Sequence, residues 1–279
     1  MIVRFAAMLG LLAGCVTAAY ASPWSDAANP SPGSAQSIGK TAEGCLAGGT
    51  ALPLDGPGFQ VIRISRHRYF GHPRTVAFLE ALGRDAGRLS LAPFYVGDMS
   101  LPRGGPMPNG HASHQTGLDA DIWFNLDSKP TLAPAARENV PLPSMVLPGG
   151  KEIDPAHFDT RQVQLLRLAA NEPNVDRIFV NPAIKRAICL GAAGSGQGDR
   201  SWIHRLRPWY GHDDHFHVRL SCPPNSPDCV RQDPVPPGDG CDASLDWWFE
   251  PHPAVTPAVP AKPKRAPVLP AACQKLIQP

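Results

Sequence analysis

The chain has 279 residues, of which 43% are hydrophobic and 18% charged, and its formal net charge is +2. This composition predicts a folded core in one large domain or two small ones. A net charge so close to zero gives no support for nucleic-acid binding through a basic face.

The first 21 residues have the layout of a secretory signal peptide. Arg4 supplies the positive start, an apolar run spans residues 5–14, and Ala19-Tyr20-Ala21 forms an A-x-A cleavage pattern before Ser22. We therefore expect export from the cytoplasm. The string L-A-G-C that ends at Cys15 resembles a bacterial lipobox, so lipidation of Cys15 is the alternative. No other segment predicts a transmembrane helix.

Composition and periodicity predict the elements of the first half in chain order. Residues 22–44 are rich in Ser, Pro, Gly and Ala and predict an extended arm. The helical spacing of Val76, Leu79 and Leu82 predicts an amphipathic helix over 74–88. Strands are expected over 61–65, 94–96, 119–124, 175–180 and 215–220, and irregular segments over 97–110 and 129–150.

The second half of the chain contains a pattern that predicts the start of a helix. Asp159 followed by Gln162 has the spacing of a capping box before a run with helical period. A short helix is expected over 184–189. Beyond Phe249, residues 251–270 are rich in Pro, Ala and Lys and predict a solvated tail. Short strands mixed with a few helices indicate the α+β class.

Cysteine usage agrees with export. Six cysteines follow the signal-like segment, and an even number in an exported chain indicates three disulfides. Spacing alone leaves about fifteen pairings open. No C-x-x-C pair is present, which argues against a cysteine zinc site. The six are Cys45, Cys189, Cys222, Cys229, Cys241 and Cys273.

Two distant clusters hold metal-binding side chains: H-A-S-H-Q-T-G-L-D-A-D at 111–121 and H-F-H at 215–217. A catalytic zinc site uses three protein ligands and keeps one position open, and His114, Asp121 and His217 would form such a set. Two neutral ligands and one anionic ligand leave a net positive charge, which lowers the pKa of a bound water. Asp119 shares the strand face of Asp121, so spacing leaves both open as the carboxylate ligand.

The remaining histidines suggest acid–base chemistry or structural roles. His215 and His217 are two residues apart in an expected strand, so both side chains face one cavity. One can bind metal while the other exchanges protons, because an unperturbed imidazole titrates near neutral pH. His212, in the turn G-H-D-D, is expected to bind an oxyanion or orient water. We expect structural or surface roles for His67, His72, His204 and His252.

Longer strings surround both clusters. They are P-G-S-A-Q-S-I-G at 32–39, R-Y-F-G-H-P at 68–73, G-H-A-S-H-Q-T-G-L-D-A-D at 110–121, R-I-F-V-N-P-A-I-K at 177–185, R-P-W-Y-G-H at 207–212 and H-F-H-V-R-L at 215–220. In this order they resemble the penicillin-insensitive murein endopeptidases, a bacterial family of zinc peptidases grouped with lysostaphin-type enzymes, D-Ala-D-Ala carboxypeptidases and the hedgehog signalling domain. The resemblance covers nearly the whole chain after the signal-like segment.

The resemblance implies a site and a reaction. It implies that His114, Asp121 and His217 bind zinc, which selects Asp121 over Asp119. It also implies that His215 is catalytic and that His212 lines the site. The implied reaction is penicillin-insensitive hydrolysis of peptidoglycan cross-links in the periplasm, notably the bond from D-alanine to diaminopimelate. The sequence does not indicate an oligomeric state.

These expectations combine into one architecture. We expect a signal peptide over 1–21, a single α+β peptidase domain over 22–250 and a Pro-rich tail over 251–279. The domain would hold a small central antiparallel sheet flanked by helices and long loops. The resemblance implies the disulfides Cys45–Cys273, which would tie the tail back to the body, Cys189–Cys241 and Cys222–Cys229.

One departure from the family concerns a second metal site, which in some members uses the first His of H-x-x-H and a later Asp-x-x-His. His111 is present here, but Gly149 and Glu152 stand at the later pair. Asp154 and His157 form another Asp-x-x-His five residues further on. We expect a solvated loop there, and His111 stays a candidate ligand of a second metal.

Two other functions would use the same metal set. A carboxypeptidase would trim terminal D-alanine, and a cell-wall binding protein would hold a purely structural metal. The presence of His215 and His212 argues against the second function, because a structural metal needs neither.

Overall fold

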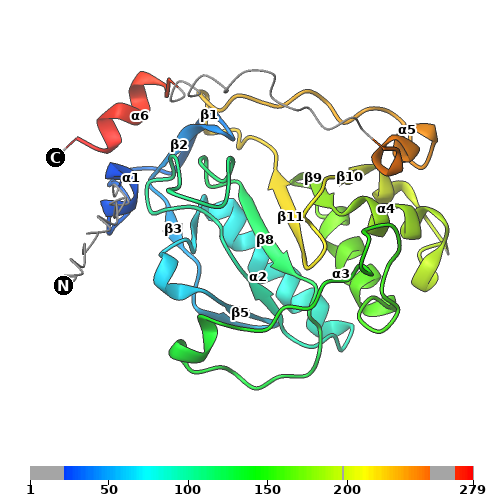
Figure 1. Cartoon of the computed structure of the whole chain (residues 1–279). Coiled ribbons are helices and arrows are strands. Elements are labelled where there is room, and N and C mark those ends of the chain that lie inside the picture. Colours follow the sequence, from blue (N-terminus) through cyan, green and yellow to red (C-terminus); the bar gives the residue numbers. More distant parts are fainter. Residues whose placement is uncertain (1–21, 197, 252–267, 279) are drawn as a thin grey trace, which may run out of the picture.

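A seven-stranded sheet forms the centre of the fold (Figure 1). The computed structural model describes residues 22–196, 198–251 and 268–278. The expected signal peptide, the Cys15 alternative and residues 252–267 of the expected tail lie outside this part of the chain. In sheet order the strands are β10 (Leu206–Pro208), β9 (Val175–Val180), β11 (His215–Leu220), β8 (Asp119–Trp123), β7 (Phe94–Val96), β5 (Phe59–Val61) and β4 (Asp55–Gly56).

The sheet is mixed. Its central strands β9, β11, β8 and β7 pair antiparallel, whereas β10 with β9 and β5 with β7 pair parallel. The expected α+β class is confirmed, and the sheet extends beyond the small antiparallel core that we expected. Two small antiparallel sheets lie outside it: β1 (Gln36–Lys40) with β2 (Glu43–Ala47), and β3 (Thr50–Ala51) with β6 (Phe70–Gly71).

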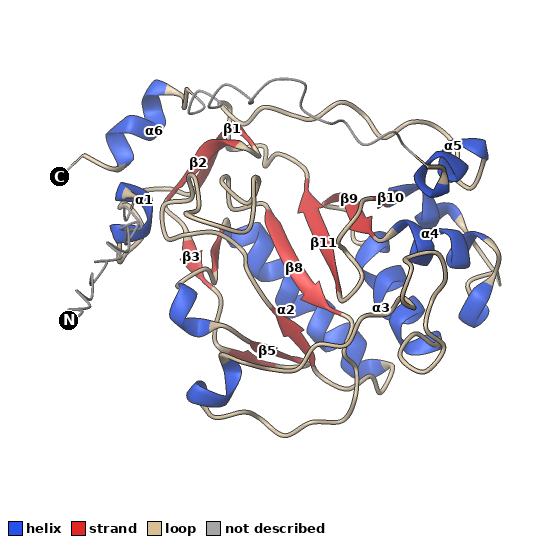
Figure 2. Cartoon of the chain, in the orientation of Figure 1, coloured by secondary structure: helices blue, strands red, loops and turns tan. Residues whose placement is uncertain are grey.

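Two long helices, α2 (Pro73–Arg88) and α3 (Thr160–Asn171), cover one face of the large sheet and contact each other (Figure 2). The apolar residues of α2 that share the predicted face, Val76, Leu79 and Leu82, are buried there. Within the described ranges, no helix combines the length and apolarity needed to cross a membrane. The helices are α1 (Pro23–Asp26), α2 (Pro73–Arg88), α3 (Thr160–Asn171), α4 (Pro182–Cys189), α5 (Ala243–Asp246) and α6 (Ala271–Leu276).

Strand alternation gives the sheet one apolar and one polar face. Ile122, Phe216 and Val218 point toward the helices and are fully buried, which stabilises the fold by about 1.5–3 kcal/mol for each large side chain. Successive side chains of a strand point to opposite faces, so the residues between these lie on the face away from the helices. They are Asp119 and Asp121 of β8, Arg177 and Phe179 of β9, and His215, His217 and Arg219 of β11.

Two predicted elements are wrong. Residues 22–44 are not an extended arm, because β1 and β2 form a hairpin that buries Ile38, and Trp24 of α1 packs beside it. Composition hid this hairpin, since Ser, Ala, Gly and Pro together dominate residues 22–44. The strand expected over 61–65 stops at Val61, because Arg63 adopts a left-handed φ of 56° and a 3-10 helix begins at Ile64.

Side chains cap both long helices. The predicted capping box is confirmed at α3: Asp159 accepts a hydrogen bond from the Arg161 N–H at 2.7 Å, and Gln162 accepts one from the Asp159 N–H at 2.9 Å. At α2, His72 Nδ1 accepts a hydrogen bond from the Arg74 N–H at 3.2 Å. The local structural role expected for His72 is therefore N-capping.

Acid should destabilise the protein partly through His72. Burial, aided by Arg74, lowers the pKa of His72 from 6.5 to about 4. Below pH 6.5 the unfolded chain takes up a proton that the folded chain binds only near pH 4, so stability falls between these values, by on the order of 2 kcal/mol. Urea unfolding from pH 7 to 4 should show a weaker pH dependence for His72→Asn, which keeps a capping oxygen but does not titrate. An unchanged pH dependence would show that protonation of His72 does not contribute to the loss of stability in acid.

Three disulfides join the cysteine pairs that the resemblance implies. Cys189–Cys241 and Cys222–Cys229 close loops in the second half of the chain. Cys45–Cys273 joins β2 to α6, and the apolar residues Trp24, Ile38 and Leu269 pack in the same cluster. The described end of the expected tail is thus tied to the body.

Removing Cys45–Cys273 should lower the free energy of unfolding by about 2–5 kcal/mol, because this bridge restricts the unfolded chain across 228 residues. Urea unfolding of the Cys45→Ala/Cys273→Ala variant measures the loss. The matched variant Cys222→Ala/Cys229→Ala opens a loop across only seven residues and should lose less. The reverse ranking would contradict an effect on the unfolded chain.

Candidate active site

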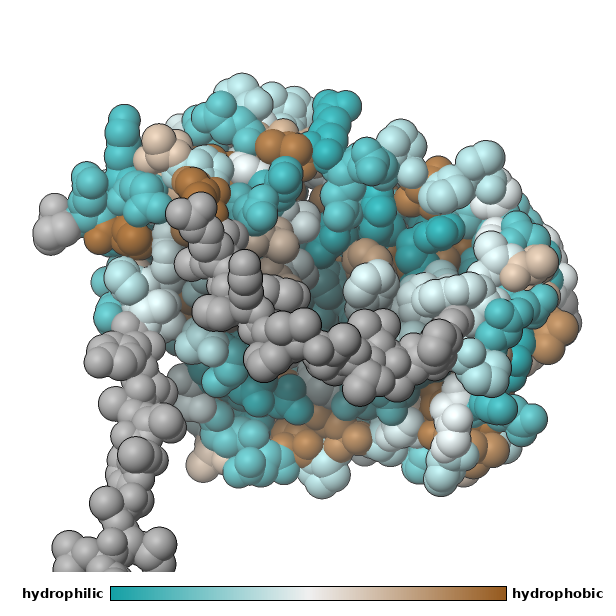
Figure 3. Space-filling view, turned by 45° about the horizontal axis from the view of Figure 1, so that its top comes forward, coloured by the Kyte–Doolittle hydropathy of each residue, from teal (hydrophilic) through white to brown (hydrophobic). Residues whose placement is uncertain are grey.

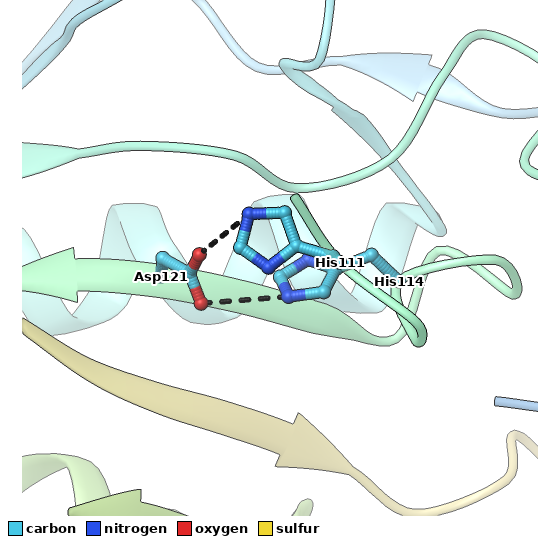
Figure 4. A group of neighbouring side chains, drawn as sticks. All are labelled: His111, His114 and Asp121. Atoms are coloured by element: carbon cyan, nitrogen blue, oxygen red, sulfur yellow. Dashed lines mark ion pairs between the residues drawn. The ribbon is translucent and has the colours of Figure 1, made fainter. Parts of the chain in front are cut away.

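Strands β8 and β11 place acidic and imidazole side chains next to each other on the polar face of the sheet. In their antiparallel register, His217 lies opposite Asp121. The loop that leads into β8 carries His111 and His114. Figure 4 shows both rings beside the Asp121 carboxylate. Residues about a hundred positions apart therefore meet on neighbouring strands.

One carboxylate oxygen, Asp121 Oδ1, has three imidazole nitrogens around it. His114 Nε2 lies 3.4 Å from it, His217 Nδ1 3.5 Å and His215 Nε2 3.9 Å. The second oxygen, Asp121 Oδ2, lies 3.5 Å from His111 Nε2. The structure thus brings together the three residues that the sequence analysis assigned to zinc, with His215 and His111 on either side.

The outer nitrogen of each of the two expected histidine ligands is already held. His114 Nδ1 lies 2.7 Å from the backbone oxygen of Met99, and His217 Nε2 lies 2.6 Å from Asp119 Oδ1. Contacts of this kind set the tautomer and the orientation of metal-binding histidines. Arg219 Nε also donates to Asp119 Oδ1, at 2.5 Å. Asp119 therefore holds His217 in place. Its position on the same strand face as Asp121 suggested a possible metal ligand, but not this orienting role.

The inner atoms of the cluster fit a metal ion. His114 Nε2 and Asp121 Oδ1 are buried and have no hydrogen-bond partner within the described ranges. Each buried unpaired polar atom costs about 1–3 kcal/mol. His114 is also held at a left-handed φ of 67°, a strained conformation for a residue other than glycine. Imidazole and carboxylate atoms that converge in this way form a donor set suited to zinc.

The charges of the cluster match a cation. Burial opposes protonation of His114, but the Asp121 carboxylate outweighs it and raises the pKa of His114. Burial, together with His114, lowers the pKa of His217 to about 4. Burial also opposes ionisation of Asp121, but His114 and His215 hold its pKa well below the ordinary value. The ionised Asp121 carboxylate therefore favours positive charge beside it.

The cluster opens into a hollow of about 550 Å³. The residues that line it include His111, His212, His217, Phe179 and Trp209. A hollow of this size can hold part of a peptide. On the face turned forward in Figure 3, hydrophilic side chains cover most of the described surface and apolar ones are scattered.

Known proteins are similar to this chain over most of its length. The family model described as penicillin-insensitive murein endopeptidase matches residues 37–278. The chain is 45% identical over 277 residues to the protein of that name from Klebsiella pneumoniae subsp. pneumoniae, covering 97% of this chain and 96% of the relative. Its relative in Yersinia enterocolitica is 44% identical over 259 residues, covering 92% and 90%, and that in Escherichia coli O1:K1 is 44% identical over 276 residues, covering 97% and 96%.

The chain belongs to the penicillin-insensitive murein endopeptidase family. This membership confirms the resemblance seen in the sequence strings. The match begins inside β1 and reaches past Cys273. The described body and the end of the tail are therefore both parts of the family's shared sequence.

In this murein endopeptidase family member, His111 belongs to the same cluster as His114 and Asp121: their candidate ligand atoms lie within 4.8 Å of one another. His111 Nε2 also lies 3.0 Å from Asp98 Oδ2, which binds Arg68 at 2.8 Å. Burial opposes ionisation of Asp98, but His111 and the nearby arginines lower its pKa to about 2. Sequence reasoning missed Asp98, because it lies in a Gly- and Pro-rich loop without a metal-binding pattern.

The alternative Asp-x-x-His pair forms a local turn. Asp154 Oδ1 accepts a hydrogen bond from the Ala156 N–H at 2.9 Å, and the His157 N–H donates to the Asp154 backbone oxygen at 3.0 Å. The side chain of His157 is exposed. These contacts agree with the solvated loop expected there.

The other two histidines predicted to act in the site, His212 and His215, lie beside the cluster. His215 Nδ1 lies 2.6 Å from Asp214 Oδ1, and its ring packs 4.9 Å from Trp123. Burial opposes protonation of His215, but Asp121 and Asp214 outweigh it and raise its pKa. The ring of His212 lies 5.0 Å from that of His215, and burial, with His215, lowers the pKa of His212. Asp214, which directly precedes His215, is a partner that sequence adjacency could have suggested.

Proposed function

We propose that this chain is a periplasmic zinc endopeptidase that hydrolyses D-alanyl–diaminopimelyl cross-links of peptidoglycan. Family membership supports a murein endopeptidase. The observation that carries the metal assignment is the approach of His114 Nε2 and His217 Nδ1 to Asp121 Oδ1, at 3.4 and 3.5 Å. Met99 and Asp119 hold the outer nitrogens of the two rings, so the inner nitrogens are available to a cation.

Different residues of the chain would carry out metal binding, proton transfer and stabilisation of the oxyanion. Bound zinc would polarise the scissile carbonyl and lower the pKa of a water molecule. Asp214 holds His215 at Nδ1, which leaves Nε2 facing the site to take a proton from the attacking water and return it to the departing amine. His212, on the rim of the hollow, would stabilise the oxyanion. Because no serine is acylated in this scheme, we expect penicillin not to inhibit.

Hollows on both sides of the cluster favour an endopeptidase over a carboxypeptidase. One of about 1000 Å³ adjoins the main hollow through His111 and Gln232 and extends to Lys40. Another of about 320 Å³ adjoins it through Phe179 and Trp209. A cross-link continues on both sides of the scissile bond and needs both spaces. A terminal D-alanine would need only one.

Digestion of purified muropeptides tests the proposal. Metal-loaded protein should convert cross-linked dimers to monomers, and it should leave terminal D-alanine on monomeric pentapeptides. Chelation should stop the reaction and added zinc should restore it. Intact dimers at every pH would refute an endopeptidase, and release of alanine alone would identify a carboxypeptidase. Binding to peptidoglycan without any released product would indicate a binding protein with a structural metal.

Replacing Asp119 and Asp121 by asparagine, one at a time, should separate their roles in zinc binding. Asp119→Asn is expected to weaken zinc binding about 10- to 100-fold, because it loses the carboxylate that orients His217. Asp121→Asn should abolish stoichiometric binding, because it removes a ligand charge. Competition with a chromophoric chelator measures both affinities. Equal effects of the two substitutions would contradict this division.

A further inference from the structure

Arg207 lies in the same cross-strand row as the expected metal ligands. In the strand registers, Arg207 pairs with Phe179, Phe179 with His217, and His217 with Asp121. Directly paired residues of neighbouring strands point to the same face, and neighbouring strands are about 4.8 Å apart. Arg207 is therefore on the face of the site, two strands from His217, at a backbone separation of roughly 10 Å.

A hollow over Arg207 joins the hollow at the histidines. It has a volume of about 320 Å³, and Phe179, Trp209 and Arg177 line both spaces. Trp209 is 55% exposed, and its ring lies 6.1 Å from that of Trp248, which also lines the smaller hollow. A ligand in the main hollow therefore reaches Arg207 by passing over Phe179.

The arginines around this path differ in how they are neutralised. Arg219 binds Asp119, and Arg177 binds Asp176 at 2.6 Å. For Arg207, the described residues provide neither a hydrogen bond nor an ion pair. Its side chain is nevertheless half-buried, and burial together with Arg177 lowers its pKa. A partly desolvated guanidinium without a bound partner is unfavourable unless a ligand supplies an anion.

We propose that Arg207, with Arg177 beside it, binds a free carboxylate of the peptide on one side of the scissile bond. This inference rests on the proposed function. In a D-alanyl–diaminopimelyl cross-link, the scissile amide nitrogen is attached to a carbon that bears a free carboxylate, so the departing half carries its charge close to the bond that breaks. A guanidinium recognises a carboxylate by two parallel, charge-assisted hydrogen bonds. The subsite therefore distinguishes a cross-link with a free carboxylate from one with a carboxamide.

Two dimers and three variants test the subsite. The dimers are cross-linked muropeptides with the diaminopimelate carboxylate either free or amidated. For Arg207→Gln we expect the KM of the free-carboxylate dimer to rise about 10- to 100-fold while that of the amidated dimer stays near the wild-type value. Arg207→Lys should keep part of the preference, because it keeps the charge. Arg84→Gln, which removes an exposed arginine of α2 on the opposite side of the sheet, should behave as wild type.

Each result bears on one of the two proposals. An equal loss on both dimers, or an undiminished preference in Arg207→Gln, would overturn the subsite and leave the endopeptidase proposal standing. If the wild-type protein hydrolyses neither dimer, the endopeptidase proposal fails. The subsite is then decided by calorimetry with a free-carboxylate diaminopimelyl peptide. Binding that weakens at least about 10-fold in Arg207→Gln supports the subsite, and equal affinities reject it.

Discussion

Replacing His114 by alanine should remove bound zinc and reduce hydrolysis of cross-linked dimers at least about 1000-fold, because the metal supplies several kcal/mol of transition-state stabilisation. His114 is fully buried, and its Nε2 is the imidazole nitrogen nearest to Asp121 Oδ1. The backbone oxygen of Met99 holds the other nitrogen of its ring, at 2.7 Å from Nδ1. Elemental analysis after dialysis, together with chromatography of the digested dimers, measures both effects.

The control for this prediction is His157→Ala, which removes an exposed imidazole from the Asp-x-x-His turn. It should keep one zinc per chain and full activity. Full zinc content in His114→Ala would refute the ligand assignment. Zinc lost from His111→Ala but kept by His217→Ala would instead identify His111, His114 and Asp121 as the ligands, the set whose atoms lie within 4.8 Å.

Replacing His215 by alanine should lower kcat by about 10²- to 10⁴-fold while zinc stays bound, because proton transfer is lost and the three proposed ligands remain. The His215 Nε2 lies farther from Asp121 Oδ1 than either proposed ligand nitrogen, and Asp214 holds the opposite edge of its ring. Timed, quenched assays of dimer hydrolysis give kcat, and elemental analysis of the same protein sample gives the amount of bound zinc.

Two further variants sharpen the role of His215. His212→Ala should also keep zinc and should reduce kcat, by up to about 10³-fold, if His212 stabilises the oxyanion. Asp214→Asn should reduce kcat more than it changes KM, because it disturbs the orientation of His215 without touching the hollow's walls. Zinc loss in His215→Ala equal to that in His114→Ala would contradict the division between ligand and proton carrier.

Local patterns were enough to place the central strands and long helices. The predicted strands 94–96, 175–180 and 215–220 coincide with β7, β9 and β11, because the preference for a strand depends on neighbouring residues. The capping box located the start of α3 for the same reason. The β1–β2 hairpin was missed, because Ile38 is buried in one cluster with Leu101 and Leu269, which are distant in sequence.

The sequence by itself determined which side chains share a face: Asp119 with Asp121, and His215 with His217. It also carried the family, through strings that span the chain. Only the tertiary structure decided which atoms meet. Alternation is set by the backbone of a single strand, whereas the order and register of strands depend on contacts between distant segments. That register placed His217 against Asp121 and Phe179, and it brought Arg207 into the row of the site, where no local pattern would have placed it.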